Sequence, residues 1–596
     1  MTIQLPRLRM IALCGVAAAA AASAIGGYFP FGGAAVMIAC WMLFIGAIAV
    51  KPRSREVWIG AIPAAVFAVG RTVGYSYETL DSYGLLLKNA KTLLSGGAAM
   101  AAMFAAALCA VLLLTRFLEA VGEQVCTEKA ETPAGRKKLF WACAALIFAG
   151  SIPYLILYAP GLNIFDTHDQ ILQFFGYPSY IGDGSALSDH HPVFLTLVYG
   201  GFMKLGLWMG DANLGQLLYS LLSMAALALC WAYALCALRD RGLGRGAVLG
   251  IALFIALYPV LALYAFNMCK DINAEPFVLL YLTMMLKLHW TDGRAAESVR
   301  FCMGLFVCSL LMMMMRKPAM YALCFAAVFM LIRYRGVRVR LAASALGAVA
   351  VFAGLYNGVI LPACGVIPGE TREMLSIPFQ QTARYLITYP DDVTEEEMQA
   401  VSNVLDVEHA VQNYDPRLAD AVKDTSNPEL NGEVLSPYLR AWLSMGLRHP
   451  GVYIDAWLKI IYGYFYPSES NTIVCLTLNS PDQGGVELTQ NEALAEKRQA
   501  VFNWIYFILR RIPVVGGLFY VDAITWAFLM LLAMAVRKDG IGGAVPYMFF
   551  VGTLGICMLS PKSGEIRYLM PILYALPVML GATLLPENRQ GREKTP

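Results

Sequence analysis

The sequence predicts an all-α polytopic membrane protein with about 14 transmembrane helices and a mainly helical extracytoplasmic domain. The 596-residue chain is 58% hydrophobic and 15% charged, whereas soluble domains carry about 25% charged residues. Its mean hydropathy is +0.58. Apolar runs also recur at about the 20-residue length that a helix needs to cross a bilayer. These three observations exclude a soluble enzyme.

The predicted spans follow the apolar runs. They cover residues 10–29, 31–50, 57–70, 96–118, 139–159, 214–238, 246–266, 272–290, 301–315, 318–332, 341–362, 515–536, 541–559 and 568–586.

Basic segments between the spans set the orientation, because Lys and Arg accumulate in cytoplasmic loops. We therefore expect a multi-pass protein of the plasma (cytoplasmic) membrane. The expected cytoplasmic segments are 51–55, 135–138, 239–245, 333–340, 537–540 and the C-terminal tail.

Residues 191–210 form one further apolar run. We do not count it as a span, because an additional crossing would reverse the orientation of everything that follows. If this run crossed the membrane, 239–245 and every later basic segment would lie outside. We therefore expect 192–208 to be an amphipathic or re-entrant helix at the outer face. The loop 160–213 then lies entirely outside.

These assignments divide the chain into four regions. Residues 1–138 form an N-terminal membrane extension of four helices, and 139–362 form a membrane core that carries the outer loop 160–213. Residues 363–514 form an extracytoplasmic domain with interfacial helices. Its 363–450 part holds fourteen acidic and six basic residues, a net charge of −8. Residues 515–596 form the last transmembrane helices and a cytoplasmic tail.

Most of the 14 cysteines lie in apolar runs, where cysteine behaves as a small hydrophobic residue. Only Cys364 and Cys475 fall in a long polar segment, so the pattern is compatible with at most one disulfide. The sequence has no P-loop and no GxGxxG motif. Any energy source is therefore an activated substrate or an ion gradient.

The outer loop concentrates ionisable residues, beginning with "FDTHDQILQFFG" at 165–176. Asp166 can cap a helix that starts at Thr167, with Asp169 as its capping-box partner and Gly176 as its terminator. A carboxylate beside the end of a span can also take the proton of a bound hydroxyl, which contributes about 10²–10⁴-fold to a rate. The two roles are compatible.

Three of the six histidines lie in the same loop. His168, Asp169, His190 and His191 are zinc-ligand types, but their spacing matches no zinc motif. We expect His190 and His191, with Asp189, to line a polar pocket, and no metal ligand is assigned. No cofactor is predicted with certainty, and a divalent metal stays open.

Cations stand at the predicted outer ends of later spans. Lys270 and Asp271 precede Glu275 in "CKDINAE", and Arg316 and Lys317 interrupt two apolar runs. Outer cations of this kind suit an anionic ligand such as a phosphate, although Lys270 and Asp271 could simply pair at the interface.

Two further segments carry candidate residues. Arg567 follows Lys562 and Glu565 in "PKSGEIRY", so it can bind a ligand or contact Glu565. Gln380 and Gln381 follow Pro378, and their amides suit sugar hydroxyls, although a helix start explains the proline equally well.

The ordered set "FDTHDQ", "SDHHP", "CKDI", "MRKP", "IPFQQ" and "GEIRY" spans residues 166–568. It resembles the GT-C superfamily of membrane glycosyltransferases, which includes protein O-mannosyltransferases and the lipid A aminoarabinose transferase. The likeness is closest to a poorly characterised bacterial branch. The four N-terminal spans and the missing DxD or DE pair depart from the superfamily pattern.

The resemblance implies transfer of a sugar from a polyprenyl-phosphate donor to an extracytoplasmic glycan, lipid or protein acceptor. Asp166 then matches the catalytic acidic position, with Asp169 as a partner. Lys270, Arg316, Lys317 and Arg567 would steady the donor phosphate. His168, Asp189, His190, His191, Asp271, Gln380 and Gln381 would contact substrate.

Two other classes stay open. A transporter or flippase of an anionic lipid or glycan would use the same outer cations but place charges along a path near the midplane. A membrane metallohydrolase would use the histidines as ligands. The lipid bilayer is the expected environment, and no nucleic-acid partner is expected.

Overall fold

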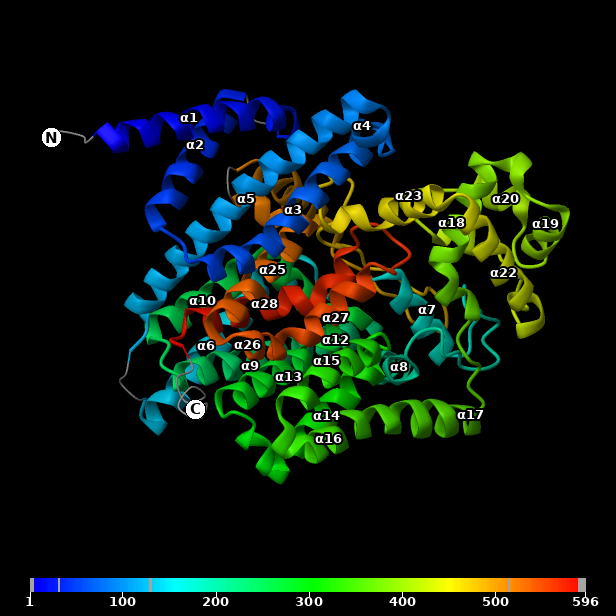
Figure 1. Cartoon of the computed structure of the whole chain (residues 1–596). Coiled ribbons are helices and arrows are strands. Elements are labelled where there is room, and N and C mark those ends of the chain that lie inside the picture. The colour runs from blue at the N-terminus through cyan, green and yellow to red at the C-terminus, as the bar shows by residue number, and fades with distance from the viewer. Residues whose placement is uncertain (1–4, 30–32, 128–130, 513–514, 588–596) are drawn as a thin grey trace.

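The computed structural model describes residues 5–29, 33–127, 131–512 and 515–587, and this part of the chain is mostly helical. Figure 1 shows the helices packed into one body, with the N-terminal helices at one corner. The all-α fold class is confirmed.

Eight helices are long and apolar enough to cross a membrane, which indicates a membrane protein. They are Met10–Tyr28 (the end of α1, Leu5–Ile25, with η1, Gly26–Tyr28), α2 (Gly33–Val50), α3 (Ser54–Leu80), α5 (Ala90–Val125), α6 (Pro133–Leu157), α9 (Ala212–Asp240), Arg335–Ala363 and Ile566–Leu584. The last two are composite. Arg335–Ala363 joins η3 (Arg335–Val337), α16 (Arg338–Ala350), η4 (Val351–Ile360) and α17 (Leu361–Ala363). Ile566–Leu584 joins η13 (Ile566–Leu569) to α28 (Met570–Leu584).

The predicted count of 14 is not reproduced, because several apolar runs form shorter helices. The shorter apolar helices are α8 (Val193–Trp208), α10 (Arg245–Leu257), α14 (Val299–Met315), α15 (Ala319–Arg333) and Ile541–Cys557, which contains α26 (Ile541–Ala544) and α27 (Met548–Cys557). The predicted span 246–266 divides at Pro259, where Tyr258 is extended and α11 (Pro259–Tyr264) begins. A residue before proline is pushed out of the helical region, which explains the break.

The membrane core is built around α9, α13 (Glu275–Trp290), α25 (Val521–Asp539) and α28. Trp231 of α9 stacks on Tyr574 of α28 with ring centroids 5.0 Å apart, and its indole nitrogen donates to the Tyr574 carbonyl. Both side chains are buried. This contact joins the middle of the chain to its last helix.

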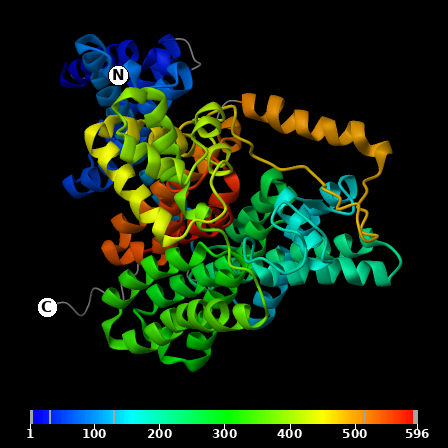
Figure 2. The same cartoon turned by 90° about the vertical axis from the view of Figure 1, so that its right-hand side faces the viewer.

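Residues 376–461 form a compact helical unit with its own core. Its helices are α18 (Ser376–Thr388), α19 (Glu395–Ser402), α20 (Val407–Gln412), α21 (Asp420–Lys423), α22 (Gly432–Arg448) and α23 (Pro450–Ile461). Phe379, Tyr385 and Tyr438 are fully buried in this core. Beyond it, an irregular segment crosses the molecule to α24 (Ala495–Asn503), as Figure 2 shows.

Two very short strands connect the loop 160–213 to the membrane core. Strand β1 (Leu162–Asn163) pairs in parallel with β2 (Asn267–Met268), with Leu162 opposite Asn267. Helix α7 (Phe165–Phe174) follows β1, and α12 (Lys270–Asn273) follows β2. The pairing therefore places the starts of both helices next to each other.

Helix α7 differs from its prediction at one end. It begins at Phe165 with Ile164 as its N-cap, and no side chain caps it, so the capping role assigned to Asp166 is wrong. Asp166 lies one residue inside the helix, where its carboxylate reaches other partners. The C-terminal prediction is confirmed, because the helix ends at Phe174 and Gly176 has a φ of +75°, which glycine tolerates best.

Helix α7 is held by a close contact with α8. A Cβ built on Gly200 would lie 1.8 Å from the Phe174 ring, whereas a Cβ on Gly201 would meet nothing within 4 Å. We expect Gly200→Ala to lower the unfolding free energy by about 1–3 kcal/mol through overpacking and Gly201→Ala to leave it unchanged or higher. Thermal unfolding in detergent measures the difference, and equal stability of the two variants would contradict this packing.

Candidate functional site

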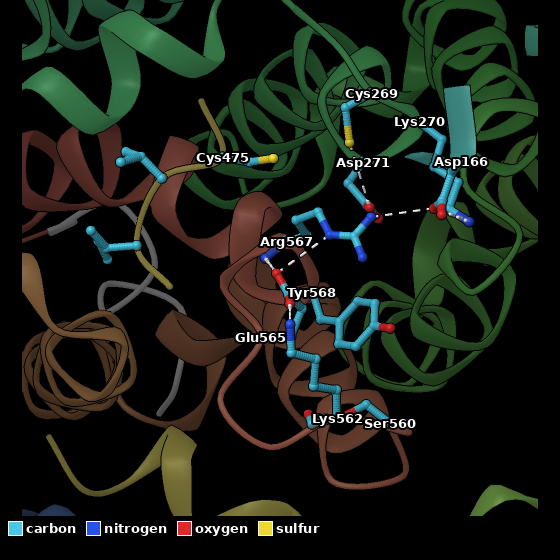
Figure 3. A network of polar contacts seen from close by, with 12 residues as sticks. Asp166, Cys269, Lys270, Asp271, Cys475, Ser560, Lys562, Glu565, Arg567 and Tyr568 are labelled. Atoms are coloured by element: carbon cyan, nitrogen blue, oxygen red, sulfur yellow. Dashed lines mark hydrogen bonds and ion pairs between the residues drawn. The ribbon is translucent and has the colours of Figure 1, made fainter. Parts of the chain in front are cut away.

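The candidate site is an ion cluster around Asp166 (Figure 3). Asp166 Oδ2 lies 2.9 Å from Lys270 Nζ and 3.2 Å from Arg567 Nη1. These residues come from α7, α12 and η13, and the strand pair fixes the first two. Thr167 strengthens that join, because its hydroxyl donates to the carbonyl of Met268. One carboxylate is thus bound by two cations that are distant in sequence.

Arg567 is oriented from its other side by Glu565. Glu565 Oε1 lies 3.3 Å from Arg567 Nε, and Glu565 Oε2 lies 2.7 Å from Lys562 Nζ. The predicted Glu565–Arg567 loop contact is therefore present. Arg567 also contacts Asp166. The contact with Glu565 therefore positions the guanidinium and leaves its Nη1 free to bind Asp166.

Asp166 is ionised in this arrangement. Burial disfavours its charged form, but Lys270 and Arg567 outweigh that cost and hold the pKa of the carboxyl well below its usual range. A carboxylate with so low a pKa is a weak base while both cations remain on it. Its basicity would rise if another anion drew the cations away.

His191 completes the cluster as a neutral partner. Its Nδ1 lies 3.0 Å from Lys270 Nζ, and Lys270 can only donate. Burial, followed by the charge of Lys270, lowers the pKa of His191 well below its usual value. The ring therefore accepts from Lys270 and stays uncharged.

This low pKa makes the folded state sensitive to mild acid. Below pH about 6.5 the unfolded chain binds a proton at His191 that the folded chain resists, so stability falls as pH drops. We expect wild-type protein in detergent to lose thermal stability from pH 7 to pH 5, and His191→Gln to lose less. His409→Gln, at an exposed position, is the control. The same loss in all three proteins would contradict the assignment.

Two predicted phosphate ligands have other partners in the structure. Arg316 Nε lies 3.1 Å from Asp271 Oδ1, and Arg316 Nη2 donates to the Tyr568 carbonyl at 3.0 Å. Arg316 and Asp271 are 5% and 3% exposed, so the pair is buried. Lys317 Nζ lies 2.8 Å from Asp189 Oδ2. The alternative Lys270–Asp271 pair does not form, because Lys270 turns to Asp166.

His168 and Asp169 form a separate contact on the same helix. His168 Nδ1 lies 3.3 Å from Asp169 Oδ1, and Asp169 is buried. Burial raises the pKa of Asp169, partly offset by His168. The pair therefore borders the Asp166 cluster without sharing its cations.

The two glutamines are used within the helical unit 376–461. Gln380 Nε2 donates to the Asp415 carbonyl at 2.6 Å, and Gln381 Nε2 donates to the Tyr453 carbonyl at 3.2 Å. Within the described residues these amides are bound to that unit's own backbone. The structure does not bring them to Asp166.

The structure brings together a set of possible metal ligands that differs from the histidine-rich set considered from the sequence. In the described part of the chain, ligand atoms of His190, Glu370 and Glu373 lie within 4.8 Å of one another. Glu370 already pairs with Arg372, and Glu373 Oε2 lies 2.8 Å from Lys423 Nζ. Cys364 and Cys475 are both free, so the disulfide that the pattern allowed is absent from the described structure.

Three asparagines that were not among the predicted site residues support the site, and two of them, Asn163 and Asn267, are fully buried. Asn163 Nδ2 donates to the Asn479 carbonyl at 3.0 Å, Asn267 Nδ2 donates to the Cys475 carbonyl, and Asn273 accepts from two tyrosine hydroxyls. They tie the irregular segment after residue 466, and helices α8 and α9, to the strand pair. In the sequence, their position beside apolar runs could have marked them as site residues, because an amide buried there requires hydrogen-bond partners.

Comparison with known proteins gives one match. No curated protein and no solved structure matches the chain. The model of a family of unknown function, DUF6020, matches residues 181–595. This range includes Lys270 and Arg567, whereas Asp166 lies just before its first residue. The chain belongs to this family, DUF6020.

Proposed function

We propose that this protein is a membrane glycosyltransferase that moves a sugar from a polyprenyl-phosphate donor to an acceptor hydroxyl on the extracytoplasmic side. The observation that carries the proposal is the Asp166 cluster, in which one carboxylate is held by Lys270 and Arg567. Such a cluster combines a proton acceptor with two phosphate-binding cations. The resemblance to GT-C enzymes supports the same assignment.

In the proposed reaction, the acceptor oxygen attacks the anomeric carbon of the sugar. The bond from that carbon to the phosphate oxygen breaks, and polyprenyl phosphate leaves with the bonding electrons. Asp166 takes the acceptor proton. Lys270 and Arg567 stabilise the negative charge that develops on the phosphate, which is the usual role of fixed cations in a site that excludes water.

The resting cluster fits this cycle because Asp166 occupies the position of an anion between two cations. A donor phosphate would compete with Asp166 for Lys270 and Arg567. As the cations move to the phosphate, the pKa of Asp166 returns toward its ordinary range. Donor binding would thereby activate the base.

A transporter or flippase of an anionic lipid is the second candidate, and one observation favours it. Glu275 is fully buried, and both its carboxylate oxygens have no hydrogen-bond partner among the described residues. Buried ionisable groups in membrane segments often mark a transport path. The group of His190, Glu370 and Glu373 bears on the metallohydrolase, but both of its glutamates already pair with cations.

The proposal is tested with purified protein in liposomes and a panel of radiolabelled polyprenyl-phosphate sugars. Transfer of label to a supplied envelope glycan, lipid or protein acceptor is the expected result. Movement of the intact labelled lipid between leaflets without transfer would favour the flippase. Neither transfer nor movement with any donor would overturn both candidates.

A further inference from the structure

A large apolar chamber lies between the N-terminal helices and the membrane core. Its volume is about 1090 Å³, and its walls come from α1, α2, α3 and α5 on one side and α10, α25 and α28 on the other. No charged side chain lines it among the described residues. Figure 1 shows α3 and α5 beside α25 and α28. A space lined by apolar side chains offers water almost no hydrogen-bond partners.

The chamber is as deep as a bilayer. On α5 the lining residues run from Met103 to Val125, a rise of about 33 Å at 1.5 Å per residue. The hydrocarbon core of a bilayer is about 30 Å thick. An acyl chain of an ordinary phospholipid fills only one leaflet, so the chamber matches a longer chain.

One end of the chamber carries a cation, Arg71, on which the nearby Asp522 acts electrostatically. Met103 marks this end, because Thr72 of α3 contacts its sulfur at 3.7 Å. The neighbouring Arg71 guanidinium lies 5.1 Å from the Phe29 ring and 4.9 Å from the Tyr466 ring. Phe29 itself lines the chamber.

Arg71 is available for an anion. Among the described residues, its Nε is buried without a hydrogen-bond partner. Asp522 acts on it electrostatically from farther away, and the Asp522 carboxylate accepts from the Trp526 indole at 3.3 Å. A half-buried guanidinium with an unused donor suits a phosphate oxygen.

We propose that the chamber and Arg71 form a binding site for a long-chain polyprenyl phosphate, with the chain along α5 and the phosphate on Arg71. The cation selects an anionic head, and the depth selects a chain longer than one leaflet. The site lies apart from the Asp166 cluster and assigns a role to the four N-terminal helices. It concerns binding alone, so it does not require the proposed transfer reaction.

The test is binding of a radiolabelled long-chain polyprenyl phosphate to the full-length protein in detergent. Arg71→Gln is expected to weaken binding about tenfold or more, since a charge-assisted hydrogen bond is lost. Ala110→Phe, which fills the chamber from α5, is expected to abolish the binding that depends on Arg71. The matched controls are Lys88→Gln and Ala101→Phe, two exposed positions outside the chamber lining.

A second measurement covers the case in which Ala110→Phe does not fold. Lipid extracted from purified wild-type protein is expected to contain polyprenyl phosphate, and less of it from Arg71→Gln. Equal binding by wild type and Arg71→Gln, or equal competition by a diacyl phosphatidic acid, would overturn the proposal. Binding of polyprenyl phosphate by the wild-type protein without any sugar transfer would count against the proposed function only.

Discussion

Asp166→Asn is expected to reduce sugar transfer by about 10²–10⁴-fold, because it removes the proton acceptor. Asparagine has nearly the same shape as aspartate, so α7 should keep its place. The variant also frees Lys270 and Arg567 from their carboxylate. We therefore expect kcat to fall while the KM for the donor stays the same or decreases. Initial rates of transfer over a range of donor concentrations measure both constants.

Asp183→Asn is the matched control for this change. Asp183 lies in the same loop, is exposed, and binds only Ser185 in the described structure. Its variant is expected to keep wild-type kcat and KM. Full activity of Asp166→Asn would remove Asp166 as the base. A rise in KM at unchanged kcat would assign it to substrate binding instead.

Arg316→Met is expected to destabilise the folded protein by about 3–5 kcal/mol, because it leaves Asp271 buried without its counter-charge. The cost should be large here, since both members of the pair are buried. Replacing both partners, in Arg316→Met with Asp271→Leu, is expected to recover most of the lost stability. Thermal unfolding of the two proteins in detergent measures the difference.

This experiment also separates two roles for Arg316. The sequence assigned it to the donor phosphate, whereas the structure pairs it with Asp271 and the Tyr568 carbonyl. A stable double variant that keeps transfer would make Arg316 structural. A stable double variant without transfer would restore the phosphate role. If the double variant is no more stable than Arg316→Met, the pair is not the source of the loss.

Much of the local structure could be predicted from the chain alone. The apolar run at 192–208 forms α8 (Val193–Trp208), close to its predicted limits. Gly176 ends α7 as expected, since its positive φ is costly for other residues. The cap at Asp166 could not be predicted correctly, because the start of α7 depends on β1. Two-residue strands leave no periodic pattern in a sequence.

The composition of the ion cluster was only partly predictable. Lys270 and Arg567 were expected near Asp166, and the structure brings them together. Arg316 and Lys317 were expected with them but pair with Asp271 and Asp189. Adjacent residues at a helix break point in different directions, and the sequence contains no information on which acid each one meets.

The sequence by itself determined that this is a helical membrane protein whose ionisable residues gather in a few short segments. Apolar content is a local property, so it can be read one segment at a time. Only the tertiary structure decided the partner of each charge and created the chamber behind the N-terminal helices. Ion pairs and cavities join residues hundreds of positions apart, such as Asp166 with Arg567, so they follow from how the helices pack rather than from any one stretch of chain.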